Sequence, residues 1–187
     1  MKRLLLILSL FVSSFTFAQK IQFGVKAGAN ISNFTGGDFK NVDKKALIGF
    51  HGGPYLRISF LNIALQPEAT ISTQGARIDS VSGSYDWKVT YVNVPVMLQV
   101  KLSPLFYIEA GPQFGFKVSE NSGDQTFNDM DLAIAGGLGI RTGGGLGLGA
   151  RYTAGLSKVG DFDASSNIDP DFKNGVVQVS LYIPLTK

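Results

Sequence analysis

The stretch from Asp131 to Leu156, "DLAIAGGLGIRTGGGLGLGARYTAGL", decides between two folds. Its segment Gly145–Ala150 satisfies the loose G-x-G-x-x-A pattern of a dinucleotide-binding loop, which is meaningful only when a helix follows. The residues that follow alternate large with small or polar side chains and show no helical 3.6-residue stripe. The same period of two precedes the turn at Thr142–Gly144. The stretch therefore predicts two antiparallel strands joined by a tight turn, and we expect no nucleotide or other cofactor.

The alternation of apolar with polar or small residues continues along the whole chain from Ile21 onward. Such a pattern is typical of strands with one apolar face. It predicts eight strands and no helix after residue 18. The predicted strands are Ile21–Ser32, Ile48–Phe60, Ile63–Ser72, Tyr91–Leu102, Phe106–Lys117, Asp131–Arg141, Leu146–Leu156 and Val177–Thr186.

The connections between these strands are alternately short and long. The short turns are predicted at 61–62, 103–104 and 142–144, and the long polar loops at 34–46, 79–85, 120–129 and 160–173. Long loops at one end and short turns at the other indicate an all-β fold, an eight-stranded antiparallel up-and-down transmembrane β-barrel. The parity of the apolar positions predicts a two-residue turn at 61–62 and odd-length loops or bulges in the fourth–fifth and sixth–seventh hairpins. Pro54, Pro67 and Pro112 are expected at bulges or at the rim.

The N-terminus has the features of a secretory signal peptide. Lys2 and Arg3 precede a short apolar run that ends at Ala18. We expect cleavage after Ala18, which makes 1–18 the signal and 19–187 the barrel domain; an N-terminal anchor helix is the alternative. Cleavage lowers the net charge from +3 to +1, which favours no nucleic-acid partner. The absence of cysteine excludes disulfides and a lipoprotein anchor.

The apolar face of the strands is expected to lie against lipid. A soluble lipocalin-like barrel would turn this face inward, but eight strands of large residues would overfill so small a lumen. The other face is rich in glycine, alanine and uncharged polar residues, which suit a crowded interior. Aromatic residues are expected in two girdles. One girdle is Phe34, Phe50, Tyr85, Trp87, Phe116 and Phe127 at the long-loop end, and the other is Phe23, Phe60 and Phe106 at the short-turn end.

Several strand motifs resemble a known family. In order they are "VKAGANISNF", "YVNVPVMLQVKL", "YIEAGPQFGF", "DLAIAGGLGI" and "LGARYTAGLSKV". They are similar to the outer-membrane β-barrel proteins of Bacteroidota called PorT-like or "porin family". The resemblance implies an eight-stranded barrel in the bacterial outer membrane, and some members of that family assist the type IX secretion system. The C-terminal residues, Ile183–Lys187, lack the final aromatic residue that assembly machinery reads in many such barrels.

The charged residues of the inward face are expected to form one network, because buried charges persist only when they are paired. This lumen polar network is predicted to comprise Lys26, Arg57, Glu68, Lys101, Glu109, Arg141 and Arg151. A two-residue turn at 61–62 makes Arg57 a diagonal neighbour of Glu68, within reach of a long side chain.

Catalytic and metal sites are less favoured. Glu68 and Glu109 are a possible carboxylate pair of a hydrolase, but the surrounding bases favour a structural role. His51 is the only histidine, and one histidine without cysteine does not favour a zinc site. Its parity points it inward, away from the membrane-facing wall on which outer-membrane lipid A deacylases use a histidine and a serine. The Asp-rich segment 160–175 lacks EF-hand spacing and is expected to be a surface loop.

These observations favour a small non-enzymatic barrel with a side-chain-filled lumen and a structural or interaction role at the cell envelope. A narrow diffusion pore is the first alternative, although eight strands enclose an interior just wide enough for side chains. An outer-membrane lipid-modifying enzyme is the second. The expected partners are outer-membrane lipids, the barrel-assembly machinery and, by the resemblance, secretion-system components.

Overall fold

The computed structural model describes residues 19–35, 43–80, 83–121, 130–156 and 173–186. The predicted signal peptide, Phe127 and most of the Asp-rich loop lie outside these residues. The strands are β1 (Gln19–Thr35), β2 (Asp43–Phe60), β3 (Ile63–Pro67), β4 (Thr70–Ser80), β5 (Gly83–Lys101), β6 (Phe106–Asn121), β7 (Met130–Arg141), β8 (Gly147–Gly155) and β9 (Lys173–Pro184).

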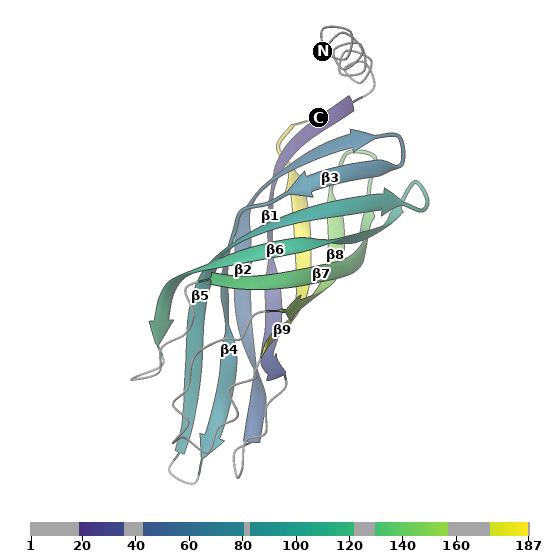
Figure 1. Ribbon diagram of the computed structural model, residues 1–187. Helices are drawn as coiled ribbons and strands as arrows, with labels where there is room; N and C mark the ends of the chain where they lie inside the picture. Colours follow the sequence, from purple (N-terminus) through teal and green to yellow (C-terminus); the bar gives the residue numbers. More distant parts are fainter. Residues whose placement is uncertain (1–18, 36–42, 81–82, 122–129, 157–172, 187) are drawn as a thin grey trace, which may run out of the picture.

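The strands form one closed antiparallel sheet. Strands that follow one another along the chain pair with each other except β3 and β4, and β1 pairs with both β2 and β9, which closes the barrel (Figure 1). Of the nine strands, β3 and β4 are two parts of one wall strand, because both lie between β2 and β5. The structure is therefore an eight-stranded antiparallel barrel, as the sequence predicts. Among the described residues, no helix is both long and apolar enough to cross a membrane.

Prolines explain the interruption between β3 and β4. Proline has no N–H, so it can accept but not return a ladder hydrogen bond. Pro54 accepts from the Ala69 amide at 3.0 Å, and Pro95 accepts from the Glu68 amide at 2.9 Å. Pro67 ends β3. Pro54, Pro67 and Pro95 therefore leave three positions around Glu68 without a backbone donor. The resulting gap in the hydrogen-bond ladders lies within the barrel wall.

The predicted positions of the prolines are therefore wrong. Pro112 also lies beside a ladder gap, between the β5–β6 pairs that involve Gln113 and Ala110. The register shifts occur elsewhere, between Ala46 and His51 and between Thr90 and Tyr91. These prolines mark missing hydrogen bonds within the wall, neither bulges nor the rim.

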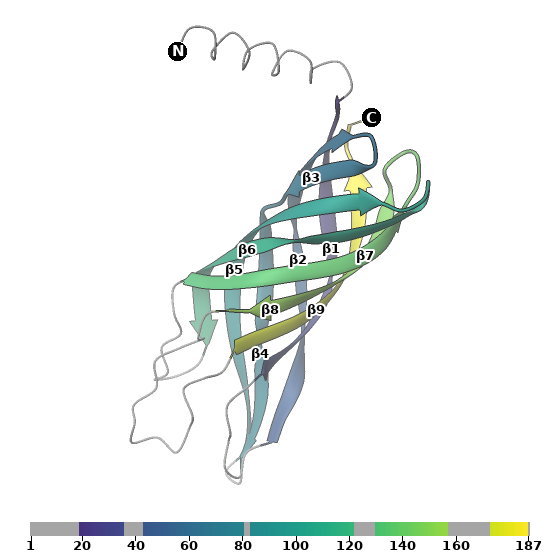
Figure 2. The ribbon, with the colours of Figure 1, turned by 45° about the vertical axis from the view of Figure 1, so that its right-hand side comes forward.

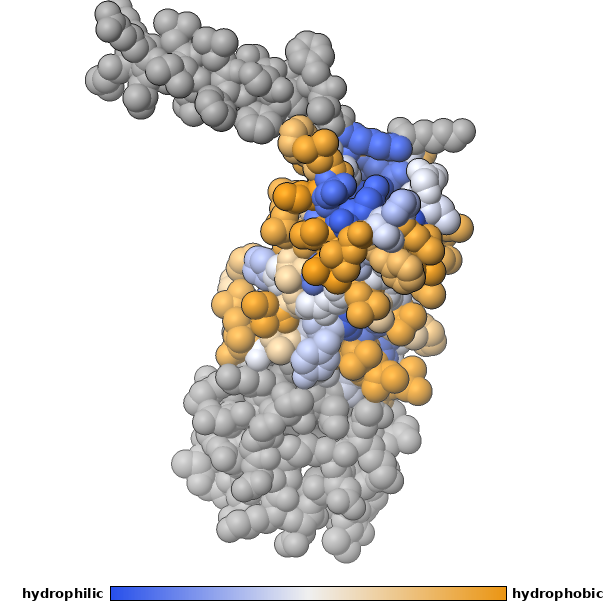
Figure 3. All heavy atoms as spheres, turned by 90° about the vertical axis from the view of Figure 1, so that its right-hand side faces the viewer, coloured by the Kyte–Doolittle hydropathy of each residue, from blue (hydrophilic) through white to orange (hydrophobic). Residues whose placement is uncertain are grey.

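The two faces of the wall have the predicted orientation. Ile48 and Phe50 are 69% and 74% exposed, whereas Gln22, Asn30 and other polar residues of the opposite parity are buried. Apolar side chains cover much of the outer surface in Figure 3. The soluble-barrel alternative is thereby excluded, since it places the apolar face inside. The described members of both aromatic girdles, Phe50 and Phe116 at one end and the second girdle at the other, point outward.

The short turns agree with the parity argument. Phe60 pairs with Ile63 across a two-residue turn, in which Leu61 takes a φ of 52°. The other two hairpins close with Lys101 opposite Tyr107 and Arg141 opposite Gly147, and each encloses an odd number of residues. We call this end of the barrel the turn end. The described chain begins and finishes there (Figure 1).

The opposite end is less regular than predicted. The pairing of β4 with β5 continues to Ser80 and Gly83, so the loop predicted at 79–85 is mostly strand. Together β2, β4 and β5 project beyond the other strands in both ribbon views (Figures 1 and 2). Glycine, serine and aspartate around this hairpin are typical of a loop, but Ile78, Tyr85 and Trp87 are residues that favour strands. We call this part, Thr73–Ser80 with Gly83–Thr90, the β4–β5 extension.

Candidate functional site

Glu68 lies in the lumen at the interruption between β3 and β4. Lys26 of β1 places its Nζ 2.9 Å from Glu68 Oε2. Arg151 of β8 reaches the same carboxylate with both terminal nitrogens, Nη2 at 2.8 Å from Oε1 and Nη1 at 3.0 Å from Oε2. The side chains of Lys26 and Glu68 are 1% and 0% exposed. A buried carboxylate thus has two cationic partners, one of them in the bidentate geometry that makes arginine–carboxylate pairs strong.

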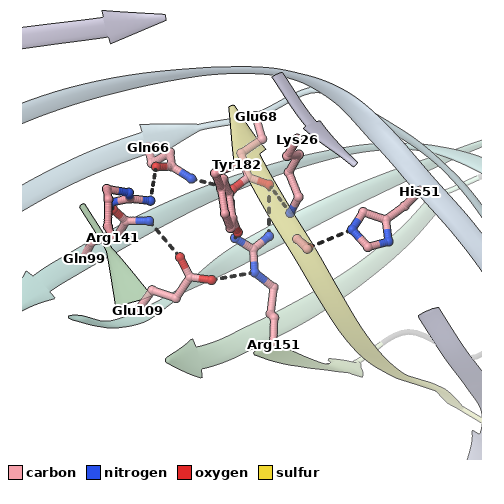
Figure 4. A network of polar contacts seen from close by, with 10 residues as sticks. Lys26, His51, Gln66, Glu68, Gln99, Glu109, Arg141, Arg151 and Tyr182 are labelled. Carbon is pink, nitrogen blue, oxygen red and sulfur yellow. Dashed lines mark hydrogen bonds and ion pairs between the residues drawn. The ribbon is translucent and has the colours of Figure 1, made fainter. Parts of the chain in front are cut away.

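A second carboxylate extends this contact. Arg151 donates from Nε to Glu109 Oε1 at 2.8 Å, and Gln99 donates to Glu109 Oε2 at 2.8 Å. Lys26, Glu68, Glu109 and Arg151 come from different parts of the wall and meet across the lumen (Figure 4). We call these four residues the mid-lumen layer. It holds two positive and two negative charges, so its formal charge is balanced.

Two further arginines lie between this layer and the turn end. Arg141 donates to Gln99 Oε1 at 2.8 Å and to Gln66 Oε1 at 3.4 Å. Its guanidinium carbon lies 4.4 Å from the centre of the Tyr107 ring. Arg57 donates to Gln22 Oε1 at 2.6 Å. Neither arginine contacts a carboxylate of the described residues.

A cavity of about 270 Å³ opens beside these two arginines at the turn end. Lys20 and Lys101 also line it, and both are exposed. Its other lining residues are neutral, and they include Leu61, Ile63, Leu105 and Phe106. We call it the turn-end cavity. Among the described residues, four cations and no acid therefore surround one concave site.

The predicted network is only partly assembled. Lys26, Glu68, Glu109, Arg141 and Arg151 are joined directly or through glutamine amides. Arg57 is a diagonal neighbour of Glu68, as predicted, because Tyr55 pairs with Glu68 in the register of the two-residue turn. The predicted contact between them is wrong, because Arg57 donates to Gln22 instead. Lys101 is exposed at the turn end and makes no contact with the network.

Tyrosines complete the filling of the lumen, and the sequence argument gave them no role. The rings of Tyr55 and Tyr182 meet edge to face with centroids 5.7 Å apart. A side chain at Gly24 would contact the Tyr55 ring, and one at Gly139 would lie 2.5 Å from the Tyr107 hydroxyl. The glycine-rich hairpin thus leaves space for aromatic rings inside a narrow barrel. The signal was present in the parity, because these tyrosines lie at inward positions.

His51 points into the lumen, as its parity predicts. Its Nε2 lies 2.8 Å from Ser180 Oγ, and both residues are buried. A serine hydrolase needs an accessible nucleophile and a group that orients the histidine. Ser180 is 2% exposed, and His51 Nδ1 has no hydrogen-bond partner within the described part of the chain. The described residues contain no cluster of three histidine or acidic side chains that could hold a metal ion.

A solved structure shares this architecture. Ail, the attachment invasion locus protein of Yersinia pestis, crystallised with the heparin analogue sucrose octasulfate, is 19% identical and superposes with a TM-score of 0.51 over 87% of this chain and 98% of its own. Neisserial surface protein A is 15% identical, with a TM-score of 0.47 over 88% and 98% of the two chains. At these identities the likeness concerns the fold. No curated protein gives a significant sequence match.

A family model provides the stronger match. Residues 17–161, most of the chain, match the family described as outer membrane protein beta-barrel domain. The closed barrel with an apolar exterior is the architecture that this description requires. The chain therefore belongs to the outer membrane protein beta-barrel family and is a protein of the outer membrane.

Proposed function

We propose that this protein is a non-conducting outer-membrane barrel with a structural or interaction role at the cell envelope. The observation that carries the proposal is the mid-lumen layer. Its side chains are between 0% and 2% exposed, so they are shielded from water. A water-filled channel would expose the polar side chains that line it. The layer instead fills the lumen with a balanced set of charges, which disfavours the diffusion-pore alternative.

Conductance in planar bilayers tests this proposal. The wild-type protein is expected to give no steady single-channel conductance. Replacing both Glu68 and Arg151 by alanine removes a matched pair and its volume, and is expected to produce measurable openings. Leu138→Ala is the control, because Leu138 lies on the outer surface and pairs with Ala150, next to Arg151. Folding of each variant is checked by heat-modifiable migration on gels. Stable wild-type channels would overturn the proposal.

The interaction role is proposed for the end opposite the turns. The chain enters the barrel at the turn end, which we place in the periplasm, so the β4–β5 extension would face the cell exterior. An epitope tag between Ser165 and Asn167 should then be labelled on intact cells, whereas a tag at Leu61–Asn62 should not. The reverse pattern would invert the topology. Cleavage after Ala18 is tested by N-terminal sequencing of the membrane-embedded protein.

A contribution to protein secretion extends the proposal through the resemblance to PorT-like barrels. Deletion of the protein should then reduce the secreted cargo of the type IX system. A shortened variant, with residues 77–86 replaced by Asn-Gly, retains the Ala76–Trp87 pair and supplies a two-residue turn. Failure of this variant to restore secretion, with normal barrel folding, would assign the role to the β4–β5 extension. Unchanged secretion after deletion would refute the contribution to secretion. It would not affect the proposal that the barrel is non-conducting.

The lipid-modifying-enzyme alternative receives less support. Its chemistry needs a nucleophile that reaches the membrane. The one histidine–serine contact of the described residues, between His51 and Ser180, is buried in the lumen. We therefore propose that the protein acts without catalysis, through its lipids and protein partners.

A further inference from the structure

The cations at the turn end of the lumen exceed the acids available to them. The two carboxylates of the mid-lumen layer are already held by Lys26 and Arg151. Arg57 is 8% exposed, and among the described residues it donates only to the neutral amide of Gln22, while Arg141 donates only to glutamines. A buried guanidinium without a counter-charge is costly. This part of the barrel therefore has a positive charge that the described protein groups do not neutralise.

The hydrogen bonding of the two arginines is also incomplete. The Nε atoms of Arg57 and Arg141 are buried and have no acceptor among the residues that the structure describes. Each Nε belongs to the planar fork with which arginine binds two oxygens of one anion. The Nε atoms themselves are covered by protein, but both side chains line the same cavity, so the parts of the two guanidinium groups that face it surround one concave space. A ligand with several acceptor oxygens can accept hydrogen bonds from both guanidinium groups there.

We propose that the turn-end cavity binds a phosphate group between Arg57 and Arg141. Lys20 and Lys101 stand at the rim and add two further positive charges. A phosphate group carries negative charge and enough oxygens to accept from both guanidinium forks. The described residues of the lining include no acid that would repel it. The cavity opens to the exterior of the barrel end, so the ligand can enter without disrupting the mid-lumen layer.

The phosphate group has two possible sources. Leu61, Ile63, Leu105 and Phe106 line the same cavity and are exposed. This places an apolar, membrane-facing rim directly beside the four cations, a combination that fits a phospholipid whose headgroup enters the cavity. A free phosphate or a small phosphorylated solute presents the same chemistry without acyl chains. The inference goes beyond the proposed non-conducting role and does not depend on it.

Calorimetric titration tests the site in dodecyl maltoside, a detergent without phosphate. Inorganic phosphate and dihexanoylphosphatidylglycerol are titrated in separate experiments at constant ionic strength set with sodium chloride. Binding of either probe to the wild type is expected. Arg57→Gln and Arg141→Gln should each weaken binding about tenfold or more, in line with the loss of charge-assisted hydrogen bonds. Lys117→Gln is the matched control, because it removes one positive charge from β6 outside the cavity and should leave the affinity unchanged.

Exposed residues provide a second test that does not risk folding. Lys20→Gln combined with Lys101→Gln should weaken binding about threefold, since both side chains are at the rim and partly screened by salt. If inorganic phosphate binds and the arginine variants weaken this binding, a small anion is sufficient as the ligand. If only the phospholipid binds, the ligand is a phospholipid headgroup. No binding of either probe, or equal binding by the wild type and both arginine variants, would overturn the proposal.

Discussion

Arg151 and Arg57 are buried arginines on the inward face of the same barrel, yet their surroundings are opposite. Arg151 contacts two carboxylates and the Tyr182 hydroxyl, with oxygens between 2.8 and 3.3 Å away. Arg57 has one neutral acceptor, Gln22, and an Nε without a partner. The same residue type, with the same parity, thus belongs to a self-contained ion network in one region and to an uncompensated positive region in the other.

The difference indicates which charges hold the barrel together and which remain available to a ligand. In the mid-lumen layer, each charge is buried because its partners are buried with it, so removing one leaves the others unpaired. At the turn-end cavity the fold supplies amides in place of carboxylates, and the open space supplies room for an anion. Substitutions in the two regions should therefore have very different effects on stability.

The largest effect is expected for Glu68→Ala. This change leaves Lys26 with no carboxylate partner and Arg151 with only Glu109, in a layer that water does not reach. The free energy of unfolding should fall by about 3–5 kcal/mol. Urea titration in detergent, followed by the folded band on unheated gels, measures it. Arg57→Gln should change the same quantity by about 1 kcal/mol or less, because it removes one hydrogen bond to an amide. Equal losses in the two variants would abolish the distinction between the regions.

Double-mutant cycles should separate the regions at a smaller scale. Glu68→Ala and Arg151→Ala remove the same bidentate pair, so their combined effect should differ from the sum by about 0.5–3 kcal/mol. Glu68→Ala and Arg57→Ala share no contact, and their effects should add to within about 0.5 kcal/mol. A large coupling energy in the second cycle would indicate that Arg57 and Glu68 interact, as the sequence predicts, although they make no contact in the structure.

The sequence could predict which residues face the lumen but not which of them meet. Parity placed Lys26, Glu68 and Arg151 on the inward face because side chains alternate strictly along a strand. Their contact is made across the barrel, between strands that are not neighbours, and it depends on the strand tilt and stagger that no local pattern records. Neighbouring-strand geometry therefore suggested Arg57 as the partner of Glu68, whereas the closed barrel brings Arg151 to it.

Depth along the barrel was equally hard to predict. Lys101 has inward parity, but it lies at the last residue of β5, where the wall ends and the side chain is exposed. The length of the β4–β5 extension was missed because its polar residues and glycine resemble a loop, although strand pairing continues to Ser80 and Gly83. Whether each turn holds an odd or an even number of residues was predictable, because this follows from the parity of the two strands that it joins. The lengths were underestimated at 103–104 and 142–144, where the closing pairs Lys101–Tyr107 and Arg141–Gly147 lie further apart.

A smaller loss is expected for Gly139→Ala, beside Tyr107, which lines the turn-end cavity. The added carbon would lie 2.5 Å from the Tyr107 hydroxyl and 2.6 Å from the Leu148 carbonyl oxygen. The backbone oxygen cannot easily move, so overpacking should cost about 1–3 kcal/mol. The displaced Tyr107 ring also supports Arg141, whose guanidinium carbon lies 4.4 Å from its centre. Phosphate affinity should therefore fall along with the urea midpoint. A loss of stability with unchanged phosphate affinity would show that the Tyr107 ring does not support the proposed phosphate site.

The smallest effect is expected for Gly136→Ala, three residues earlier on the same strand and on the opposite face. A carbon added at Gly136 would find only the Glu109 carbonyl oxygen within 4 Å, at 3.9 Å, which is an ordinary contact. Its φ is not among the positive values of the described glycines, so alanine fits the backbone. The alanine lowers the conformational entropy of the unfolded chain and adds a methyl group to the apolar exterior, so the free energy of unfolding should stay unchanged or rise by up to about 1 kcal/mol. Phosphate affinity should match the wild type. A loss comparable to that of Gly139→Ala, in urea titrations run side by side, would mean that backbone flexibility of β7 and not space for Tyr107 requires these glycines.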